Sequence, residues 1–373
     1  MNVLVINLVK ATFNARSTNR YRLEEYSRLV DKMFVVVWTK EKEEPIVWQN
    51  KLFIYPTNSK FRLLYFLDSL RLAGKIRKKH GLDLVLTQDP FETGLAGWII
   101  AGWFRLKLLM QIHTDFLSSY FWKESLLNKF RVFLAKILVR KAHSLQVVSE
   151  RIKKSLLPIT RYPLLVTTLP IFIDIKKIQV MPIKENLHQK YPQFDFIILM
   201  ASRLSREKNI GLAIRTMAEV VKKYPKAGLV IVGTGPEREN YSLLITHYSL
   251  LNNVILENAI PFEQLISYYK TADLFLLTSN YEGYGMAVTE AMAAGCPVIM
   301  TDVGLAGEIL ENNKEGMVVP VGNKEKLVEA ISNLIENKEL REQLTDNALE
   351  KVKNFPTKEE YLANYKKLLE GCH

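Results

Sequence analysis

Short apolar runs rich in β-branched residues alternate with amphipathic stretches along the whole chain. This alternation is typical of parallel sheets built from strand–helix–strand units. Between the runs, segments such as 209–224 carry apolar residues at helical spacing. The sequence therefore predicts an α/β protein. The expected strands are 3–9, 34–38, 83–87, 107–113, 144–148, 196–201, 229–232, 273–277 and 297–301.

The length of the chain, 373 residues, exceeds what one ordinary core organises and favours two domains. We expect one domain over 1–178 and a second over 179–355, with the junction in the polar, irregular stretch 175–193. Residues 356–373 predict a last helix that begins near Pro356 and has one apolar face. From the sequence alone this helix could pack on either domain.

Composition excludes several classes of protein. Hydrophobic residues make up 48% and charged residues 24%, as in globular proteins. No segment offers about 20 uninterrupted apolar residues. The first residues read as a strand rather than an export signal, and two cysteines make a disulfide framework unexpected. We therefore expect a cytoplasmic protein.

The net charge of +12 is divided unequally along the chain. Residues 1–180 hold 30 Lys and Arg against 14 Asp and Glu, whereas residues 181–373 hold 21 against 25. A basic first half suggests contact with an anionic surface. Nucleic acid, a phospholipid leaflet and a pyrophosphate-linked lipid all carry the negative charge that such a surface attracts.

Two glutamates bracket a glycine-rich turn and the helix that is expected to follow it. The segment runs from Glu282 through Gly283, Tyr284 and Gly285 to Glu290. The glycines allow peptide N–H groups to approach a ligand, and the positive end of the helix favours phosphate. If both were helical, the glutamates would lie about 12 Å apart along the axis. This spacing suits a nucleotide sugar, with hydroxyls at both ends and phosphates between them.

These residues resemble a known family. Seven residues separate the two glutamates, an aromatic–glycine step follows the first, and a small-residue helix ends in Gly295-Cys296-Pro297-Val298. The pattern is similar to that of the retaining glycosyltransferases of family 4, and the resemblance is strongest from Ile197 to Glu350. It implies the GT-B fold, two Rossmann-like domains that face each other across a cleft. In that family a last helix crosses back onto the first domain.

The resemblance also implies roles for the charged residues. Glu282 would contact the donor sugar and the catalytic centre, and Glu290 would hold the ribose hydroxyls. Arg203 and Lys208 follow an expected strand, where open parallel sheets bind ligands. They match the family pair that binds the donor diphosphate and stabilises the departing nucleotide. Since fixed cations and a helix end can replace a metal, and no Asp-x-Asp is present, we expect neither a metal nor a cofactor.

Further donor contacts are expected from main-chain positions. Gly233 and Gly235 form a turn after a strand, although a third glycine of the dinucleotide fingerprint is missing. Their backbone would border the nucleotide. Ile260 stands where the family's backbone meets the base.

The first half yields weaker candidates. His113 ends an expected strand and would face the cleft near the donor sugar, as a histidine does in the resembled family. Asp115 could orient it or bind the acceptor. Many family members carry a glycine pair after the first strand, but this chain has none there. Arg16 and Arg20 are candidate substitutes in acceptor binding.

Two basic, aromatic segments favour an anionic membrane surface. One begins at 61–66 and runs into a lysine-rich stretch, and the other spans 121–141. Aromatic residues beside lysines suit an anionic leaflet. The alternative for the second is an apolar stripe that faces the core while its lysines are solvated.

The sequence thus predicts a retaining glycosyltransferase that moves a sugar from a nucleotide diphosphate donor to a hydroxyl acceptor. The expected acceptor is a lipid-linked saccharide or polysaccharide intermediate at the inner membrane leaflet. A nucleotide-sugar 2-epimerase on the same fold remains an alternative. A nucleic-acid-binding protein is a third, although the sequence contains no recognition helix, aromatic RNA-binding strand or zinc spacing.

Overall fold

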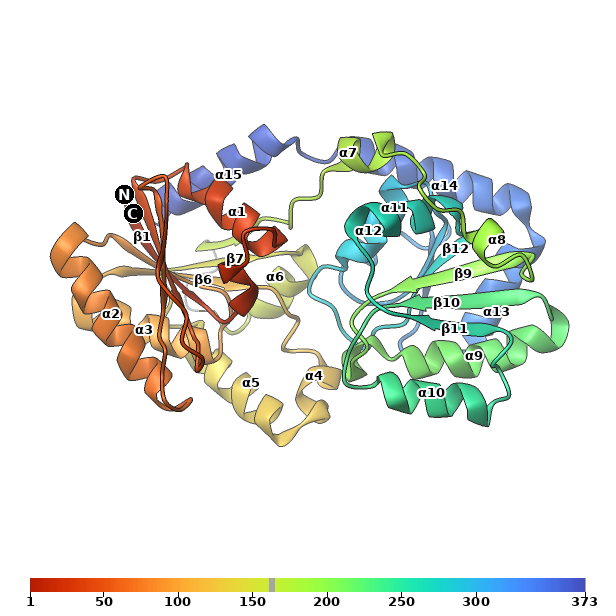
Figure 1. Cartoon of the computed structure of the whole chain (residues 1–373), viewed down its shortest axis with the longest axis horizontal. Helices are drawn as coiled ribbons and strands as arrows, with labels where there is room; N and C mark the ends of the chain where they lie inside the picture. The colour runs from red at the N-terminus through yellow and green to blue at the C-terminus, as the bar shows by residue number, and fades with distance from the viewer. Residues whose placement is uncertain (161–164, 373) are drawn as a thin grey trace. The chain divides into compact units, whose positions relative to one another are not determined.

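The computed structural model describes residues 1–160 and 165–372. The chain folds into two compact units (Figure 1). Unit 1 comprises Met1–Pro170 together with Lys358–His373, and unit 2 comprises Ile171–Thr357. The division thus falls after Pro170, and the C-terminal segment belongs with the N-terminal unit.

Unit 1 is built on an eight-stranded sheet whose order is β3-β4-β2-β1-β5-β6-β7-β8. Every pairing is parallel except that of β3 with β4. The strands are β1 (Asn2–Asn7), β2 (Lys32–Val37), β3 (Ile46–Trp48), β4 (Leu52–Pro56), β5 (Leu84–Thr87), β6 (Lys107–Ile112), β7 (Ser144–Val147) and β8 (Val166–Thr168). The helices are η1 (Lys10–Phe13), α1 (Thr18–Ser27), α2 (Leu64–His80), α3 (Glu92–Phe104), α4 (Ser119–Glu124), α5 (Leu126–Leu138), α6 (Glu150–Leu156) and α15 (Lys358–Gly371).

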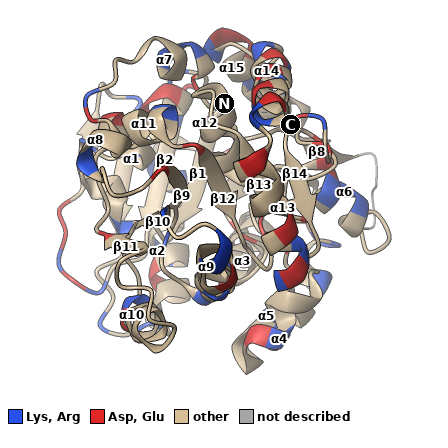
Figure 2. Ribbon diagram, turned by 90° about the vertical axis from the view of Figure 1, so that its right-hand side faces the viewer, with Lys and Arg blue, Asp and Glu red and all other residues tan. Residues whose placement is uncertain are grey.

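Unit 2 is built on a six-stranded parallel sheet of order β11-β10-β9-β12-β13-β14. Its strands are β9 (Phe196–Ala201), β10 (Ala227–Val232), β11 (Val254–Glu257), β12 (Leu274–Leu277), β13 (Val298–Thr301) and β14 (Met317–Val319). Its helices are α7 (Ile175–Val180), α8 (Leu187–Lys190), η3 (Arg206–Lys208), α9 (Ile210–Lys223), α10 (Arg238–His247), α11 (Phe262–Thr271), α12 (Met286–Ala293), α13 (Lys324–Glu336) and α14 (Lys338–Lys353). Acidic and basic residues both colour the ribbons of α13 and α14 (Figure 2).

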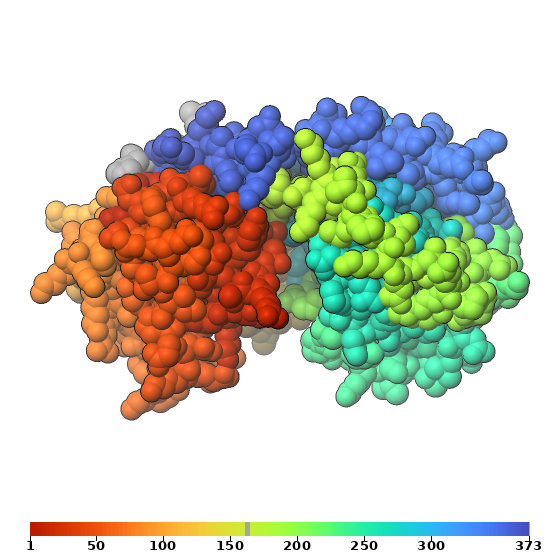
Figure 3. All heavy atoms as spheres, turned by 45° about the horizontal axis from the view of Figure 1, so that its top comes forward, coloured from red at the N-terminus to blue at the C-terminus, as the bar shows by residue number. Residues whose placement is uncertain are grey.

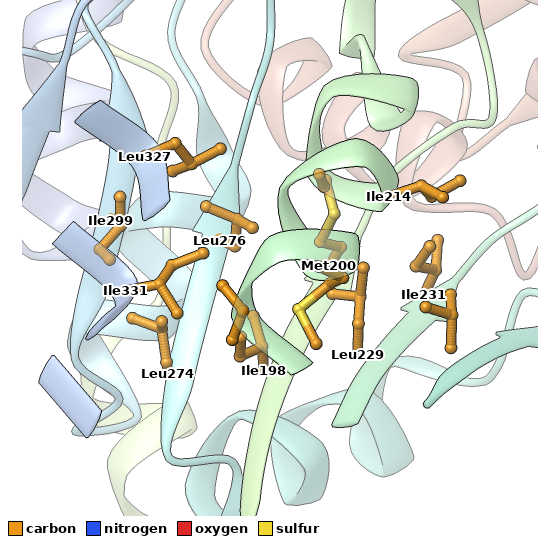
Figure 4. Close-up of a cluster of buried hydrophobic side chains, with 14 of the residues drawn as sticks. Ile198, Met200, Ile214, Leu229, Ile231, Leu274, Leu276, Ile299, Leu327 and Ile331 are labelled. Carbon is orange, nitrogen blue, oxygen red and sulfur yellow. The ribbon is translucent and has the colours of Figure 1, made fainter. Parts of the chain in front are cut away.

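The core of unit 2 explains why these strands pair as they do. Apolar side chains of β9, β10, β12 and β13 form one buried cluster with those of α9 and α13 (Figure 4). Ile198, Leu229 and Leu276 are at most 1% exposed. Strands buried on both faces carry continuous apolar runs, which is why the sequence predicted them. Burial of apolar area, at roughly 25 cal/mol per Å², is the main force that holds the helices on the sheet.

The strand order has a direct consequence for ligand binding. In each unit the first strand lies inside the sheet: β2, β4 and β3 follow on one side of β1, β10 and β11 follow on one side of β9, and the later strands of each unit follow on the other side. This is the doubly wound order, in which ligands bind beyond the carboxyl ends of the two central strands. In unit 2 these strands are β9 and β12, and in unit 1 they are β1 and β5.

The C-terminal helix α15 packs on unit 1. The ring of Tyr365 stacks on that of Tyr26 of α1, with centroids 4.2 Å apart. The hydroxyls of Tyr26 and Tyr361 are hydrogen-bonded at 3.1 Å. Figure 3 shows the atoms of α15 in contact with those of the N-terminal segment. The apolar face expected over 356–373 is thus used in this contact, and residue 373 lies outside the described residues.

Candidate active site

A lysine and a glutamate meet beyond the two central strands of unit 2. Lys208 lies in η3, after β9, and Glu282 lies in the turn after β12. Lys208 Nζ is 2.5 Å from Glu282 Oε1, and the two side chains are 20% and 11% exposed. Ser279 Oγ donates to the same carboxylate oxygen at 2.7 Å. A charged pair this shielded costs desolvation and is retained only with good geometry.

Main-chain hydrogen bonds hold the two loops that carry this pair together. Asn280 N donates to Glu207 O at 2.8 Å, and Thr278 Oγ1 donates to Lys208 O at 3.0 Å. The side chains of Asn209 and Asn280 bond to each other at 3.0 Å. These contacts fix the positions of Lys208 and Glu282 before any ligand arrives, so the pair is preorganised.

Arg203 differs from Lys208 in its surroundings. Its side chain is 70% exposed and pairs with Glu207, Nη2 to Oε1 2.5 Å. Ser205 Oγ also donates to this carboxylate. Burial acts to raise the pKa of Glu207, but the hydrogen bonds from Ser205 and Arg203 together lower it. Glu207 therefore stays ionised and positions the guanidinium, whose remaining N–H groups are accessible.

The glycine-rich turn leads directly into α12. Gly285 is the residue before the helix and has φ of +99°, a conformation that favours glycine. Gly285 has no side chain, so the residue before α12 supplies no side-chain cap to the helix. Its main-chain donors and positive dipole end therefore face the region that Glu282 occupies. Tyr284 as a whole is only 4% exposed, so its ring is not available to a ligand.

Glu290 is anchored from a neighbouring helix. It lies in α12, and Tyr269 Oη of α11 donates to Glu290 Oε2 at 3.3 Å. Tyr269 is fully buried. Burial and, secondly, the charge of Glu290 raise the pKa of Tyr269 well above its usual range. The hydroxyl therefore remains a donor to the carboxylate. Sequence reasoning missed Tyr269, because only the packing of α11 on α12 reveals it.

The glycines after β10 have a packing role. A Cβ on Gly233, whose φ is +152°, would stand 1.9 Å from Ser202 O. A Cβ on Gly235 would stand 2.3 Å from Leu204 O. Both glycines thus allow the β10 turn to press against the loop that carries Arg203. Ile260 lies half-buried between β11 and α11.

The candidates from the first half all lie in unit 1. His113 follows β6 with its side chain exposed. Partial desolvation by neighbouring atoms and, secondly, the charge of Arg22 lower the pKa of His113. Since the ordinary pKa of histidine is about 6.5, the ring is mainly neutral at pH 7.

Two other unit 1 candidates differ in accessibility. Asp115 is half-buried, and its Oδ1 has no hydrogen-bond partner among the described residues. Burial raises the pKa of Asp115, while the charge of Arg151 acts against this. Arg20 is 4% exposed and its Nε donates to Glu24 Oε1 at 2.7 Å. Arg20 is thus occupied within the fold, whereas Arg16 is exposed just before α1.

Two absences concern the described residues only. Within residues 1–160 and 165–372, no three His, Cys, Asp or Glu side chains gather in a way that could hold a metal ion. Over the same ranges, no helix is both long and apolar enough to cross a bilayer.

The two doubly wound units define a protein of the GT-B fold class. Two family models match the chain. One, Glycosyltransferase Family 4, covers residues 24–177, and the other, Glycosyl transferases group 1, covers residues 183–351. The chain belongs to glycosyltransferase family 4 and is a retaining, nucleotide-sugar-dependent glycosyltransferase. The resemblance and the GT-B fold expected from the sequence are confirmed.

A curated relative agrees with this membership, and solved structures agree with the fold. Alpha-monoglucosyldiacylglycerol synthase from Acholeplasma laidlawii is 26% identical over 304 residues, which are 77% of this chain and 74% of that protein. Sucrose-phosphate synthase from Thermosynechococcus elongatus has a similar fold, with a TM-score of 0.83 at 19% identity, covering 100% of this chain and 99% of that one. HepE from Anabaena in complex with UDP-glucose has a TM-score of 0.77 at 18% identity, covering 100% and 99%.

Proposed function

We propose that this enzyme binds the diphosphate of a nucleotide sugar between Lys208, Arg203 and the start of α12. The observation that carries the proposal is the Lys208–Glu282 pair, held beyond the two central strands of unit 2. Fixed cations and a helix N-terminus supply the positive charge that a departing nucleoside diphosphate requires. No divalent metal is then needed.

The two glutamates hold the sugars on either side of the diphosphate. Glu282 accepts hydrogen bonds from hydroxyls of the transferred sugar. Glu290, oriented by Tyr269, accepts hydrogen bonds from the ribose hydroxyls. In the unliganded enzyme Lys208 neutralises Glu282. When the donor binds, Lys208 also faces the phosphate and Glu282 gains hydroxyl donors. Each charge therefore remains paired throughout.

The transfer itself proceeds with retention. The acceptor hydroxyl oxygen forms a bond to the anomeric carbon on the same face from which the nucleoside diphosphate leaves. The bond between that carbon and the phosphate oxygen breaks, and the hydroxyl proton passes to the leaving diphosphate. Lys208 and Arg203 stabilise the charge that develops on it. Such stabilisation is typically worth a factor of about 10² to 10³ per donor group.

The acceptor is a lipid-linked saccharide or polysaccharide intermediate at the inner leaflet, which the enzyme meets as a peripheral protein on the cytoplasmic side. Two observations support this class. Unit 1 is built mainly from the basic half of the sequence, and the Acholeplasma laidlawii relative is named for a glycolipid product. Asp115, with its unpartnered buried oxygen, is the candidate that we propose for the acceptor hydroxyl, with His113 and Arg16 as further candidates.

A thermal-shift screen of nucleoside diphosphates and their sugars tests the donor site. We expect the melting temperature to rise for one base, because a ligand that binds only the folded state stabilises it. UDP-glucose is the first donor to try. The shift should disappear in Arg203→Ala and Glu290→Ala. If no nucleotide shifts the wild type, the donor site is wrong; release of free epimerised sugar from donor alone would instead favour a 2-epimerase.

A further inference from the structure

The helix α5 presents an apolar stripe to solvent rather than to the core. Leu126, Phe130, Phe133 and Ile137 recur at the spacing of one helix face, and they are 81%, 61%, 64% and 43% exposed. The side that packs against unit 1 is a different one, formed by Asn128, Ala135 and Leu138, all buried. The alternative of a core-facing stripe is therefore wrong for these four residues.

Aromatic side chains extend this stripe onto α4. Trp122 is 44% exposed, and Lys129 Nζ lies over its ring, 5.6 Å from the centroid. Phe121, its neighbour, is instead buried and stacks on Phe91. We name Trp122, Leu126, Phe130, Phe133 and Ile137 the α4–α5 surface. An exposed apolar face of this kind is typical of a surface that binds a membrane or another protein.

Cations lie along one side of the same stripe. Lys129 and Lys136 are two helical turns apart on α5, next to Phe133. Arg140 continues this row one turn later, and Lys123 precedes it on α4. Among the described residues, neither Lys129 nor Lys136 takes part in an ion pair. Their charge is thus available to an external anion.

The positive charge continues beyond the end of α5. Lys141 lines a pocket of ≈ 370 Å³ together with Arg105, Lys107 and Trp98 of the neighbouring α3 segment. The segment around 61–66, for which the sequence also predicts membrane contact, differs from α4 and α5. There Tyr65 and Phe66 pack on Trp38, with ring centroids 5.0 and 5.2 Å away. Phe61, Leu63 and Leu67 there are nevertheless exposed. The exposed apolar surface of α4 and α5 is the longer one, because four residues of one helix face and Trp122 contribute to it.

We propose that the α4–α5 surface docks unit 1 on an anionic lipid bilayer, with the apolar stripe at the acyl boundary and the lysines at the headgroup phosphates. The occupant follows from charge complementarity. An apolar stripe flanked by lysines on an interfacial helix matches the layered chemistry of an anionic leaflet. This proposal rests on the lipid-linked acceptor of the proposed function. It does not involve the donor site, which lies in unit 2.

Vesicle flotation of the full chain tests the proposal. Vesicles of phosphatidylcholine alone are compared with vesicles containing equal parts phosphatidylglycerol, at low ionic strength and at about 0.5 M NaCl, where charges are screened within a few Å. We expect binding to the anionic vesicles and its release by salt. Equal binding to both vesicles, or binding that resists salt, overturns the electrostatic part of the proposal.

Two paired variants localise the surface. Lys129→Gln/Lys136→Gln should lower the partition coefficient about 30-fold, since each lysine near an anionic surface contributes about a factor of five. Its charge-matched control is Lys222→Gln/Lys226→Gln in unit 2, at side chains that are 70% and 68% exposed. Phe130→Ser/Phe133→Ser should lower the coefficient more than tenfold. Its control is Leu243→Ser/Leu251→Ser, which removes apolar groups of similar exposure.

Further measurements separate the possible failures. The four variants replace exposed side chains, so each should keep the melting temperature and the donor-induced thermal shift of the wild type. If the controls lose vesicle binding as much as the α4–α5 variants, the surface is not specific. If the wild type is a dimer that Phe130→Ser/Phe133→Ser dissociates, the surface receives a second copy and the lipid proposal is wrong. Loss of the donor shift in the wild type would contradict the proposed function alone.

Discussion

The two units share the doubly wound arrangement of strands but use its central position differently. Beyond β9 and β12 of unit 2, two charged side chains meet and are held by hydrogen bonds between loops. At the end of β1 of unit 1, amide and hydroxyl groups interact instead: Asn7 and Asn19 both donate to Thr12 Oγ1. Beyond β5, Asp89 accepts from Phe91 N and Thr93 N at the start of α3. One topology thus offers a binding position twice, and the side-chain chemistry is the reason why we propose the diphosphate site in unit 2.

The largest effects should follow from breaking the ion pair of unit 2. Lys208→Met should lower kcat/KM about 10²- to 10³-fold, because a fixed charge at the leaving group is lost. It should also destabilise the fold, since Glu282 is left shielded and unpaired. The double variant Lys208→Met/Glu282→Leu should recover the melting temperature but not activity. If the single variant keeps full activity, the pair does not serve the reaction.

Arg203 should matter for the donor but not for the fold. Arg203→Ala removes an exposed cation whose ion pair with Glu207 contributes at most about 1 kcal/mol. We expect donor affinity to fall about tenfold or more and the melting temperature to change little. Titration calorimetry with the nucleotide found by the screen measures the first, and thermal unfolding the second. An unchanged affinity would place the diphosphate elsewhere.

A smaller effect should come from the anchor of Glu290. Tyr269→Phe removes one hydroxyl donor, worth about 0.5 to 1.5 kcal/mol, so donor affinity should fall about 3- to 10-fold. The matched control is Tyr268→Phe on the same helix. Its hydroxyl donates to Glu257, and it is equally buried. If both variants weaken the donor equally, the effect is one of helix packing.

The corresponding change in unit 1 should leave donor binding unaltered. Asp89→Ala removes the carboxylate that accepts from the first turn of α3, and loss of such a cap typically costs about 1 kcal/mol. We therefore expect a lower melting temperature with unchanged affinity for the donor. A lower affinity for the donor would show that the central position of unit 1 also binds the nucleotide. The contrast between the units would then be lost.

The smallest effect is expected from chelation. If Arg203, Lys208 and the start of α12 supply the positive charge, EDTA should leave the rate unchanged. An initial-rate assay with and without EDTA, followed by added Mg²⁺ or Mn²⁺, measures this. A rate lost with EDTA and restored by one ion would show that fixed cations are insufficient.

The central strands were predictable, but the edge strands were not. All nine expected strands are present, within about two residues at each end. The prediction missed β3, β8, β11 and β14, which form the four edges of the two sheets, and β4 beside an edge. Edge strands are short and half-exposed and so lack a continuous apolar run. In β4 the terminal Pro56 argues against a strand.

The amino-acid order alone determined the class of fold and the family, and it supplied the candidate residues for the donor site. These properties are local, because apolar runs, glycines and a glutamate pair at fixed spacing are visible in a short window. Which residues contact one another was decided only by the tertiary structure. Lys208 and Glu282 are far apart in the chain, and so are Tyr269 and Glu290, but each pair is in contact in the structure. The exposure of the α5 stripe depends on which face of the helix packs against the unit. Such choices follow from packing free energy summed over whole units.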